Sequence, residues 1–299
     1  KGFFVNELAL PFQIAGNVSD LQLLPEEESP HAASQAEQAY FPGMARIYRR
    51  LLSEQPEILQ KRPPHFGCAV LRNALAGYLR RYRNMIVAPA NILIGSGAEF
   101  FYNMIVQFFG KDTIYAIEDP SYEKIRNVYE ANGAEVDPLR MGPSGILSSE
   151  LARTRAGVLH VTPYHSFPTG ITADAKKRYE YLETAARNNG YIIEDDFDSE
   201  YAFYKKPLEP LYAMDRSGSV VYMNTFSKSL SPAIRIAYMI LPDKLLEEYR
   251  VKMGFYACPV PVLDQYVLAS FIENRSFERH LNRIRRSRTK TQENNVSNF

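Results

Sequence analysis

One lysine in the sequence stands in a setting that suits covalent chemistry. Lys228 lies in the run Asn224–Arg235, which is rich in hydroxyl residues and separates two apolar segments. Lysine is rarely buried unless it is paired or reactive, and a partly desolvated lysine amine can form a Schiff base with a carbonyl group. Thr225, Ser227 and Arg235 would supply hydrogen-bond donors for a phosphate on the same molecule. On composition alone, a surface turn between two strands explains this run equally well.

An acidic cluster favours the chemical interpretation. The apolar segment Tyr191–Ile193 runs directly into Glu194–Asp198, which contains four acids. In an open parallel sheet, ligands bind beyond the carboxyl ends of the strands. A carboxylate at that place can pair with a protonated ring nitrogen and keep the ring an electron sink, as a pyridoxal cofactor requires. We expect one acid to have this role and the others to be solvated or capping residues, because like charges are costly to bury together.

A glycine turn and an aromatic residue follow two other apolar segments. The turn Gly95–Glu99 leads into a helical pattern, and the free N–H groups at a helix start favour an anion such as phosphate. Many turns of this kind bind nothing, so the signal is weak alone. Tyr122 follows the strand pattern Thr113–Ile117 and could stack on a planar ring, although a tyrosine packed in the core at a helix start is the simpler interpretation.

The elements that would position these residues alternate along the chain. Short apolar runs and longer segments of helical period predict an α/β fold with a mainly parallel sheet flanked by helices. The expected strands are Ile92–Ile94, Thr113–Ile117, Gly157–Val161, Tyr191–Ile193, Ser219–Met223 and Ile236–Leu241. The expected helices are Val70–Leu79, Glu99–Phe109, Tyr122–Asn132, Ala173–Asn188 and Asp243–Tyr256, with a short one near Met44–Leu52 and two more after Val260.

Composition excludes several classes of protein. The chain has 299 residues, with 35 Lys+Arg against 34 Asp+Glu, so its net charge of +1 gives no overall attraction to nucleic acid or to an anionic membrane. Cys68 and Cys258 match no metal or redox spacing, and we expect no metal and two reduced thiols. No apolar run is long enough to span a bilayer, which predicts a cytoplasmic protein without membrane contact. The basic run Arg279–Lys290 is interpreted as a solvated helix face.

The combined motifs resemble the fold-type-I pyridoxal phosphate enzymes, the aspartate aminotransferase superfamily. Within it, the sequence is most similar to the MocR-type branch of the GntR transcriptional regulators. That branch carries Thr/Ser-Phe-Ser-Lys with a later Arg, Glu-Asp-Asp-aromatic-Asp-Ser-Glu, and Thr-Pro-x-His-x-aromatic-Pro-Thr-Gly. The corresponding segments here are Thr225–Lys228 with Arg235, Glu194–Glu200 and Thr162–Gly170, and the resemblance extends from about Leu71 to Arg286.

The resemblance implies a role for each candidate site residue. Lys228 would form the internal aldimine with pyridoxal 5'-phosphate, Tyr122 would stack on the ring, and Asp195 would pair with the ring nitrogen, with Asp196 the weaker choice. The remaining cofactor-binding residues would be Gly97, Ala98, Glu99, Phe197, Thr225, Ser227 and Arg235.

Three features of the sequence depart from the family pattern. Phe197 stands where a tyrosine usually donates to the phenolic oxygen of the cofactor, and Ala98 and Glu99 replace hydroxyl and amide residues in the phosphate turn. The tyrosine that a partner subunit often lends to the phosphate is not evident near His65–Gly67.

These motifs predict a large cofactor domain with partial neighbours. Residues 1–5 look like the end of a winged helix, 6–63 an arm or linker, 64–258 the pyridoxal phosphate-binding large domain, and 259–299 the start of an incomplete small C-terminal domain. The carboxylate-binding arginine of that small domain cannot be assigned in this chain.

The resemblance leaves three functions open. The leading hypothesis is an effector-sensing domain of a GntR/MocR-type regulator that takes an amino compound, forms a homodimer, and reaches DNA only through a winged-helix domain outside this chain. The alternatives are an active class I/II aminotransferase acting on an amino acid and a 2-oxo acid, and a cofactor-free oligomerisation module.

Overall fold

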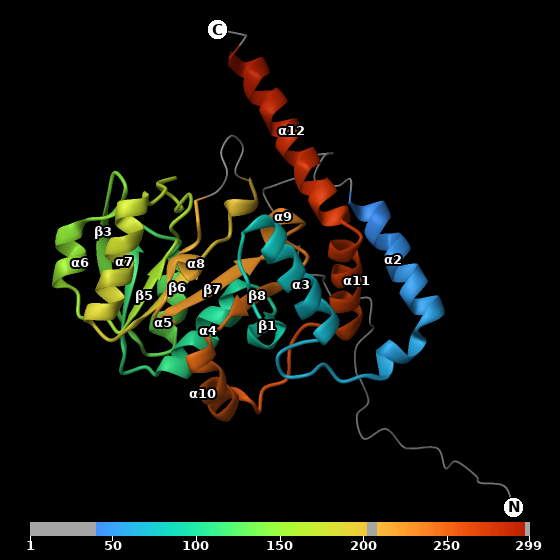
Figure 1. Cartoon of the computed structure of the whole chain (residues 1–299), viewed down its shortest axis with the longest axis horizontal. Coiled ribbons are helices and arrows are strands. Elements are labelled where there is room, and N and C mark those ends of the chain that lie inside the picture. Colours follow the sequence, from blue (N-terminus) through green and yellow to red (C-terminus); the bar gives the residue numbers. More distant parts are fainter. Residues whose placement is uncertain (1–39, 202–207, 297–299) are drawn as a thin grey trace, which may run out of the picture. The chain divides into compact units, whose positions relative to one another are not determined.

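The computed structural model describes residues 40–201 and 208–296 of the chain (Figure 1). The predicted winged-helix remnant at 1–5 and most of the predicted arm lie outside the described residues. The described residues belong to one compact unit.

The centre of this unit is an eight-stranded sheet in the order β1-β8-β7-β6-β5-β2-β3-β4. The strands are β1 (Ile92–Gly95), β2 (Ile114–Asp119), β3 (Glu135–Gly142), β4 (Gly145–Ile146), β5 (Val158–Val161), β6 (Tyr191–Asp195), β7 (Val220–Thr225) and β8 (Ala237–Ile240). The five neighbours β7, β6, β5, β2 and β3 run parallel, whereas β8 is antiparallel to both β7 and β1. The mainly parallel sheet predicted from the sequence is therefore confirmed.

Helices cover both faces of the sheet. They are α2 (Phe41–Glu54), α3 (Ala69–Tyr82), α4 (Ala98–Phe109), α5 (Glu123–Ala131), α6 (Ser148–Arg153), α7 (Ala175–Arg187), α8 (Leu211–Met214), α9 (Phe226–Ser229), α10 (Asp243–Met253), α11 (Val262–Glu273) and α12 (Ser276–Val296). Short 3-10 turns occupy Pro56–Gln60, Pro89–Asn91 and Ser199–Tyr201.

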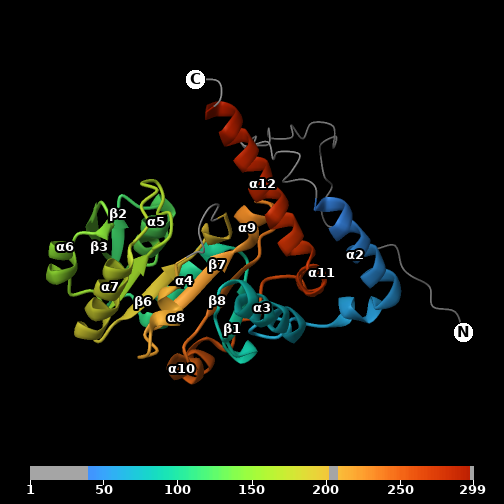
Figure 2. The same cartoon turned by 45° about the horizontal axis from the view of Figure 1, so that its top comes forward.

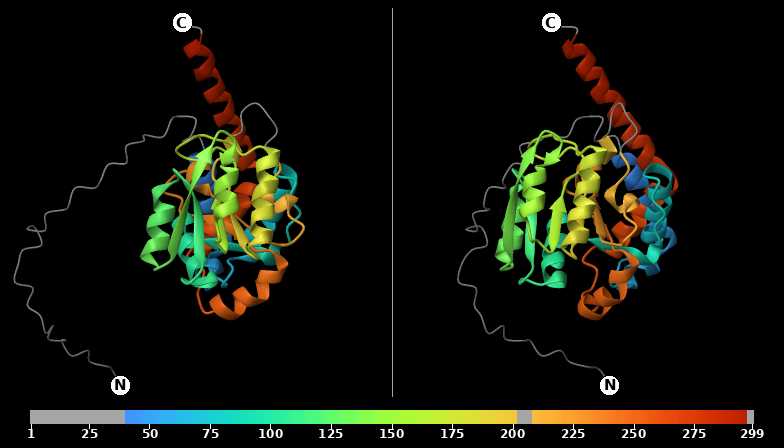
Figure 3. Two further views of the ribbon diagram at one scale, coloured as in Figure 1. Left: turned by 90° about the vertical axis from the view of Figure 1, so that its left-hand side faces the viewer. Right: turned by 60° about the vertical axis from the view of Figure 1, so that its left-hand side comes forward.

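Side chains that alternate between the two faces of each strand divide the apolar core into layers. In β7, Val221 and Met223 pack with α4, α5 and α10, while Tyr222 between them packs with α2, α3 and α11. On the same face of the sheet as Tyr222, Ile192 of β6 packs in an apolar cluster with residues of α6 and α7. Successive side chains of a strand point to opposite faces, so one apolar run contributes to both layers. Figure 3 shows helices on both sides of the sheet.

The helices α2, α3 and α11 pack side by side at the β1 edge of the sheet (Figure 2). Their buried residues, among them Leu51, Leu75 and Leu268, belong to the same apolar core as β1 and β8. The helix pattern predicted near Met44–Leu52 is present as α2, and the pair predicted after Val260 is present as α11 and α12. The predicted domain boundary between 258 and 259 stays a prediction.

Two strands, β3 and the two-residue β4, were absent from the sequence-based expectation. In β3 only Leu139 is buried, and the strand contains Pro138, which has no N–H to donate to a ladder. Its position near the sheet edge explains both features, because among the described strands β3 pairs along its length with β2 and on its other side only with the two-residue β4.

Candidate functional site

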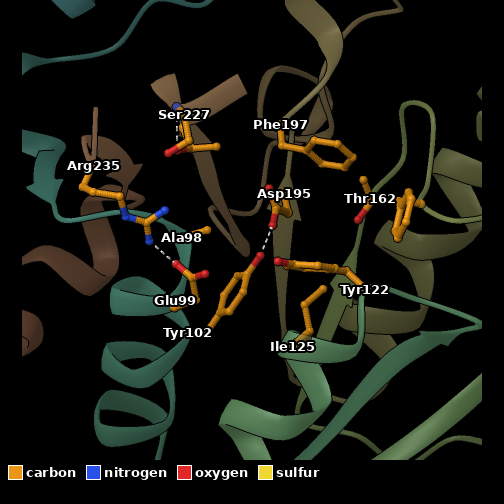
Figure 4. A pocket seen from close by; sticks show the side chains of 12 residues that line it. Ala98, Glu99, Tyr102, Tyr122, Ile125, Thr162, Asp195, Phe197, Ser227 and Arg235 are labelled. Atoms are coloured by element: carbon orange, nitrogen blue, oxygen red, sulfur yellow. Dashed lines mark hydrogen bonds and ion pairs between the residues drawn. The ribbon is translucent and has the colours of Figure 1, made fainter. Parts of the chain in front are cut away.

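A cavity of about 290 Å³ opens where β5, β6 and β7 end and α4 and α5 begin (Figure 4). Such a place, beyond the carboxyl ends of parallel strands, is where α/β sheets bind ligands. The residues that line it are Ala98, Glu99, Tyr102, Tyr122, Ile125, Thr162, Phe167, Asp195, Phe197, Thr225, Ser227 and Arg235. Most of the site residues predicted from the sequence are therefore brought together, and Gly97 and Lys228 lie next to the cavity rather than on its wall.

Asp195, the last residue of β6, presents an unsatisfied oxygen at this site. The side chain is 3% exposed, and its Oδ2 accepts a hydrogen bond of 2.7 Å from the Tyr102 hydroxyl. Its Oδ1 is buried and has no hydrogen-bond partner among the described residues. A buried acceptor left unpaired costs about 1–3 kcal/mol, so a ligand that donates a hydrogen bond here is favoured.

Asp196 is engaged on a different side of the strand. Its Oδ2 accepts hydrogen bonds from Arg83 at 2.5 Å, Tyr222 at 2.6 Å and Ser199 at 2.8 Å. Burial alone would lower the pKa of Arg83, but the neighbouring Asp196 carboxylate, together with Tyr222, Glu194 and Tyr238, holds that pKa above its usual value. Asp196 therefore stabilises the fold, and Asp195 is the acid that faces the cavity.

Two residues behind Asp195 were missed from the sequence. Tyr102 lies one helical turn after Ala98, so both share the face of α4 that lines the cavity. Burial, together with Asp195, raises the pKa of Tyr102 well above its usual value, which keeps its hydroxyl a hydrogen-bond donor. His160 of β5 lies with its Nε2 3.8 Å from Asp195 Oδ2, and its Nδ1 bonds the Tyr129 hydroxyl at 2.7 Å. Tyr102 could have been predicted from the sequence, because it lies one helical turn after Ala98 in the glycine turn.

The opposite end of the cavity gathers donors for an anion. Gly97 has a φ of +94° and ends the turn before α4, whose first N–H groups have no partner within the helix. A Cβ at Gly97 would collide with the Arg235 guanidinium, so glycine is needed for Arg235 to approach this turn. Thr225 caps the short helix α9, and its hydroxyl lies 3.2 Å from that of Ser227.

Glu99 places a negative charge in the same region. Its carboxylate pairs with Arg235 and, at 3.1 Å, with Lys124. Burial alone would raise the pKa of Glu99, but the hydrogen bonds from Lys124 and Arg235 lower it below its usual value, so the group is ionised. An incoming phosphate would therefore compete with Glu99 for Arg235.

Aromatic rings form another part of the cavity wall. Tyr122 precedes α5, and its ring lies 6.2 Å from that of Phe167 at an interplanar angle of 79°. Phe197 contributes a third ring from the turn after β6 (Figure 4). Tyr122 is 38% exposed, which leaves part of its ring free to contact a planar ligand.

Lys228 lies in α9 at the rim of the cavity. Its Nζ is 2.6 Å from Asp198 Oδ1 and 4.7 Å from the centre of the Phe197 ring. Because Phe197 also lines the cavity, its contact with Nζ places the lysine amine beside the cavity wall.

Other kinds of site are not evident in the described ranges 40–201 and 208–296. None of the helices there is long and apolar enough to cross a bilayer. Within the same residues, no group of three or more metal-binding side chains is arranged to hold an ion.

Comparisons with known proteins agree with this geometry. The model of the family "Aminotransferase class I and II" matches residues 24–296. The solved structure of LysN, the α-aminoadipate aminotransferase of Thermus thermophilus complexed with N-(5'-phosphopyridoxyl)-L-leucine, superposes with a TM-score of 0.72 at 25% identity. This match covers 82% of the chain and 64% of LysN, and it confirms the predicted fold-type-I architecture.

Curated relatives are transcriptional regulators. The chain is 35% identical over 226 residues to the HTH-type transcriptional regulator YdeL of Bacillus subtilis, covering 75% of the chain and 49% of YdeL. It is 30% identical to the rhizopine catabolism regulatory protein MocR of Rhizobium meliloti, covering 72% of the chain and 44% of MocR. The chain thus spans about half the length of the curated relatives it matches, and the predicted resemblance to MocR-type regulators is confirmed. By its family model, its fold and the site that this fold assembles, the chain belongs to the aminotransferase class I and II family.

Proposed function

We propose that this chain is the pyridoxal phosphate-binding, effector-sensing part of a MocR-type transcriptional regulator. Two kinds of support meet in this proposal. The relatives that match the chain at 30–35% identity are regulators, and the cavity carries the residue types that pyridoxal phosphate needs.

The residues present fit this cofactor. The Oδ1 of Asp195, unpartnered within residues 40–201 and 208–296, can accept a hydrogen bond from a protonated ring nitrogen, and Tyr122 offers its ring face. The start of α4, with Thr225, Ser227 and Arg235, offers N–H and O–H donors to a phosphate. When bound, the cofactor would supply a carbonyl carbon for an amine and an aromatic ring that withdraws electrons.

Asp195, Tyr102 and Lys228 would have different roles toward the cofactor. Asp195 would keep the ring nitrogen protonated, and Tyr102 fixes the orientation of Asp195 through its 2.7 Å hydrogen bond. Lys228 would supply the amine that bonds to the cofactor. An amino compound would displace Lys228, and this displacement would be the signal that the regulator senses.

The observation that carries the proposal is the buried Oδ1 of Asp195, which has no hydrogen-bond partner in the described part of the chain and belongs to a residue lining a cavity whose far end contains anion donors. A structural aspartate would be satisfied, as Asp196 is by Arg83 and Tyr222. An acceptor at one end and phosphate donors at the other match the two polar ends of pyridoxal phosphate.

Spectroscopy with a panel of amines tests the sensing role. The purified protein with pyridoxal phosphate should absorb visible light, and an effector amine should change that absorption without converting the cofactor to pyridoxamine phosphate. Conversion by an amino donor, with reversal by a 2-oxo acid, would refute the sensor and support an aminotransferase. That second function is favoured by the likeness of the fold to LysN.

The partners of the whole protein are also proposals. Two copies of the chain would form a homodimer, as fold-type-I sites normally require. DNA would be bound by a winged-helix domain, in keeping with the HTH-type relatives, of which the chain covers about half. We place this regulator in the cytoplasm.

A further inference from the structure

Asp198 joins two parts of the chain that border the cavity. Its Oδ1 lies 2.6 Å from Lys228 Nζ, and its Oδ2 pairs with the Nδ1 of His165. The Asp198 side chain is 7% exposed, whereas those of Lys228 and His165 are 39% and 57% exposed. A buried carboxylate is stable only when partners surround it, so Asp198 favours keeping both contacts.

The contact with Asp198 holds the Lys228 amine at the rim. Phe197 lines the cavity, and Nζ lies over its ring, where the negative face of an aromatic ring attracts a cation. The carboxylate and the ring thus bind Lys228 as an ammonium. An ammonium has no lone pair to offer a carbonyl carbon, so these contacts compete with any bond between Lys228 and a carbonyl compound.

His165 extends the arrangement to a neighbouring loop. It has a φ of +54°, a backbone conformation that non-glycine residues adopt at a cost of about 1–2 kcal/mol and keep only when their surroundings demand it. The next residue, Ser166, is anchored by its hydroxyl to Glu118 at 2.6 Å and by its N–H to the Ile171 carbonyl at 2.8 Å. Phe167 follows and lines the cavity.

We propose that Asp198 is a positioning residue that binds the Lys228 ammonium at the rim of the cavity and couples its position to the loop 163–172 through His165. Whenever the Lys228 amine is released from a carbonyl compound, it forms an ion pair with the Asp198 carboxylate. When this ion pair forms or breaks, the charge on the Asp198 carboxylate is shared differently between Lys228 and His165. The strength of the contact with His165 then changes, and with it the stability of the loop that contains Phe167. The role in sensing rests on the proposed function, whereas the ion pair and its effect on Lys228 do not.

Lysine labelling without any cofactor tests the first half of the proposal. The full chain is treated briefly with acetic anhydride at mildly alkaline pH, and the acetylation rate of each lysine is read by peptide mass spectrometry. Asp198→Asn should raise the rate at Lys228 roughly two- to fivefold, the factor that corresponds to an ion pair at a partly exposed site. Asp198→Glu, which keeps the charge, should label much as the unmodified chain does.

Two references separate this effect from general loosening of the fold. Lys252, which pairs with Glu248 at 2.6 Å on the exposed side of α10, should label at an unchanged rate in every variant. Asp119→Asn, which removes an exposed carboxylate paired with Arg126, should leave Lys228 unchanged. An unchanged Lys228 rate in Asp198→Asn, measured relative to Lys252, overturns the proposal.

Hydrogen exchange tests the coupling to the loop. Asp198→Asn and His165→Ala should each speed amide exchange in residues 163–172 while leaving α7 unchanged. If Asp198→Asn does not fold, Lys228→Met provides the same readout, because it removes the ammonium and leaves the carboxylate in place. Unchanged exchange in the loop in Lys228→Met and in His165→Ala refutes the coupling. Because no cofactor is present, a failure of cofactor binding would not alter these results.

Discussion

Glu99 is the residue whose replacement should strengthen cofactor binding. In the structure its carboxylate forms ion pairs with two cations, Arg235 and Lys124. Glu99→Gln keeps the size of the side chain and its hydrogen-bonding capacity while it removes the charge. A phosphate at this place would then meet an unoccupied Arg235 and no competing anion.

The size of the effect follows from Coulomb's law. Two anions that share one guanidinium lie about 5 Å apart, and two unit charges at that distance repel by about 1–3 kcal/mol for an effective dielectric constant between about 80 and 20. The Glu99 side chain is 31% exposed, which favours the lower half of this range. We therefore expect a gain of about 1–2 kcal/mol, or a roughly five- to thirtyfold lower dissociation constant.

Calorimetric titration with pyridoxal phosphate measures this gain. It is best performed in a Lys228→Ala background, so that only noncovalent contacts with the phosphate and the ring contribute. Glu123→Gln is the matched control, since it removes an exposed charge from the first turn of α5 without touching the cavity. Equal or weaker binding by Glu99→Gln would refute the assignment of this turn to the phosphate.

Three further predictions follow from individual contacts. Asp195→Asn should weaken pyridoxal phosphate binding by about tenfold or more, because it removes the charge that attracts the ring N–H, and titration calorimetry would reveal an unaltered affinity if this is wrong. Asp174→Ala should lower the free energy of unfolding by about 1 kcal/mol in urea titrations, since the Asp174 carboxylate caps α7 by accepting from the Lys177 N–H at 2.8 Å. Burial raises the pKa of Glu118 to about 8, so the folded chain retains a proton that the unfolded chain loses above about pH 5. The unfolding free energy should fall as pH rises from about 5 to about 8, and Glu118→Gln should flatten this slope; an equally steep slope in the variant would contradict it.

Most of the sheet could be predicted because its strands are short apolar runs with helical patterns between them. All six expected strands are present, with boundaries that shift by one or two residues. β3 could not be found this way, because an edge strand has little apolar surface to reveal it and Pro138 argues against a strand. The small helices α6, α8 and α9 are too short to show a period.

Site residues could be predicted from the sequence only where a short local run of residues indicates the chemistry. Acids at the end of β6 and the Lys228 run gave a local signal, but the choice between Asp195 and Asp196 depended on partners from distant parts of the chain. Arg83 comes from the segment after α3 and Tyr222 from β7, and no local pattern connects either with Asp196. Tyr102 could have been found from its helical spacing to Ala98, whereas the contact of Asp198 with His165 and Lys228 joins three separate segments.

Borohydride reduction followed by peptide mapping decides whether Lys228 holds the cofactor. The protein would be incubated with pyridoxal phosphate, reduced and digested, and the modified lysine identified by mass spectrometry. We predict loss of visible absorption on reduction, a phosphopyridoxyl group on Lys228, and neither signal in Lys228→Ala. A protein that stays colourless after addition of the cofactor, or a modification spread over surface lysines and retained in Lys228→Ala, would contradict the assignment.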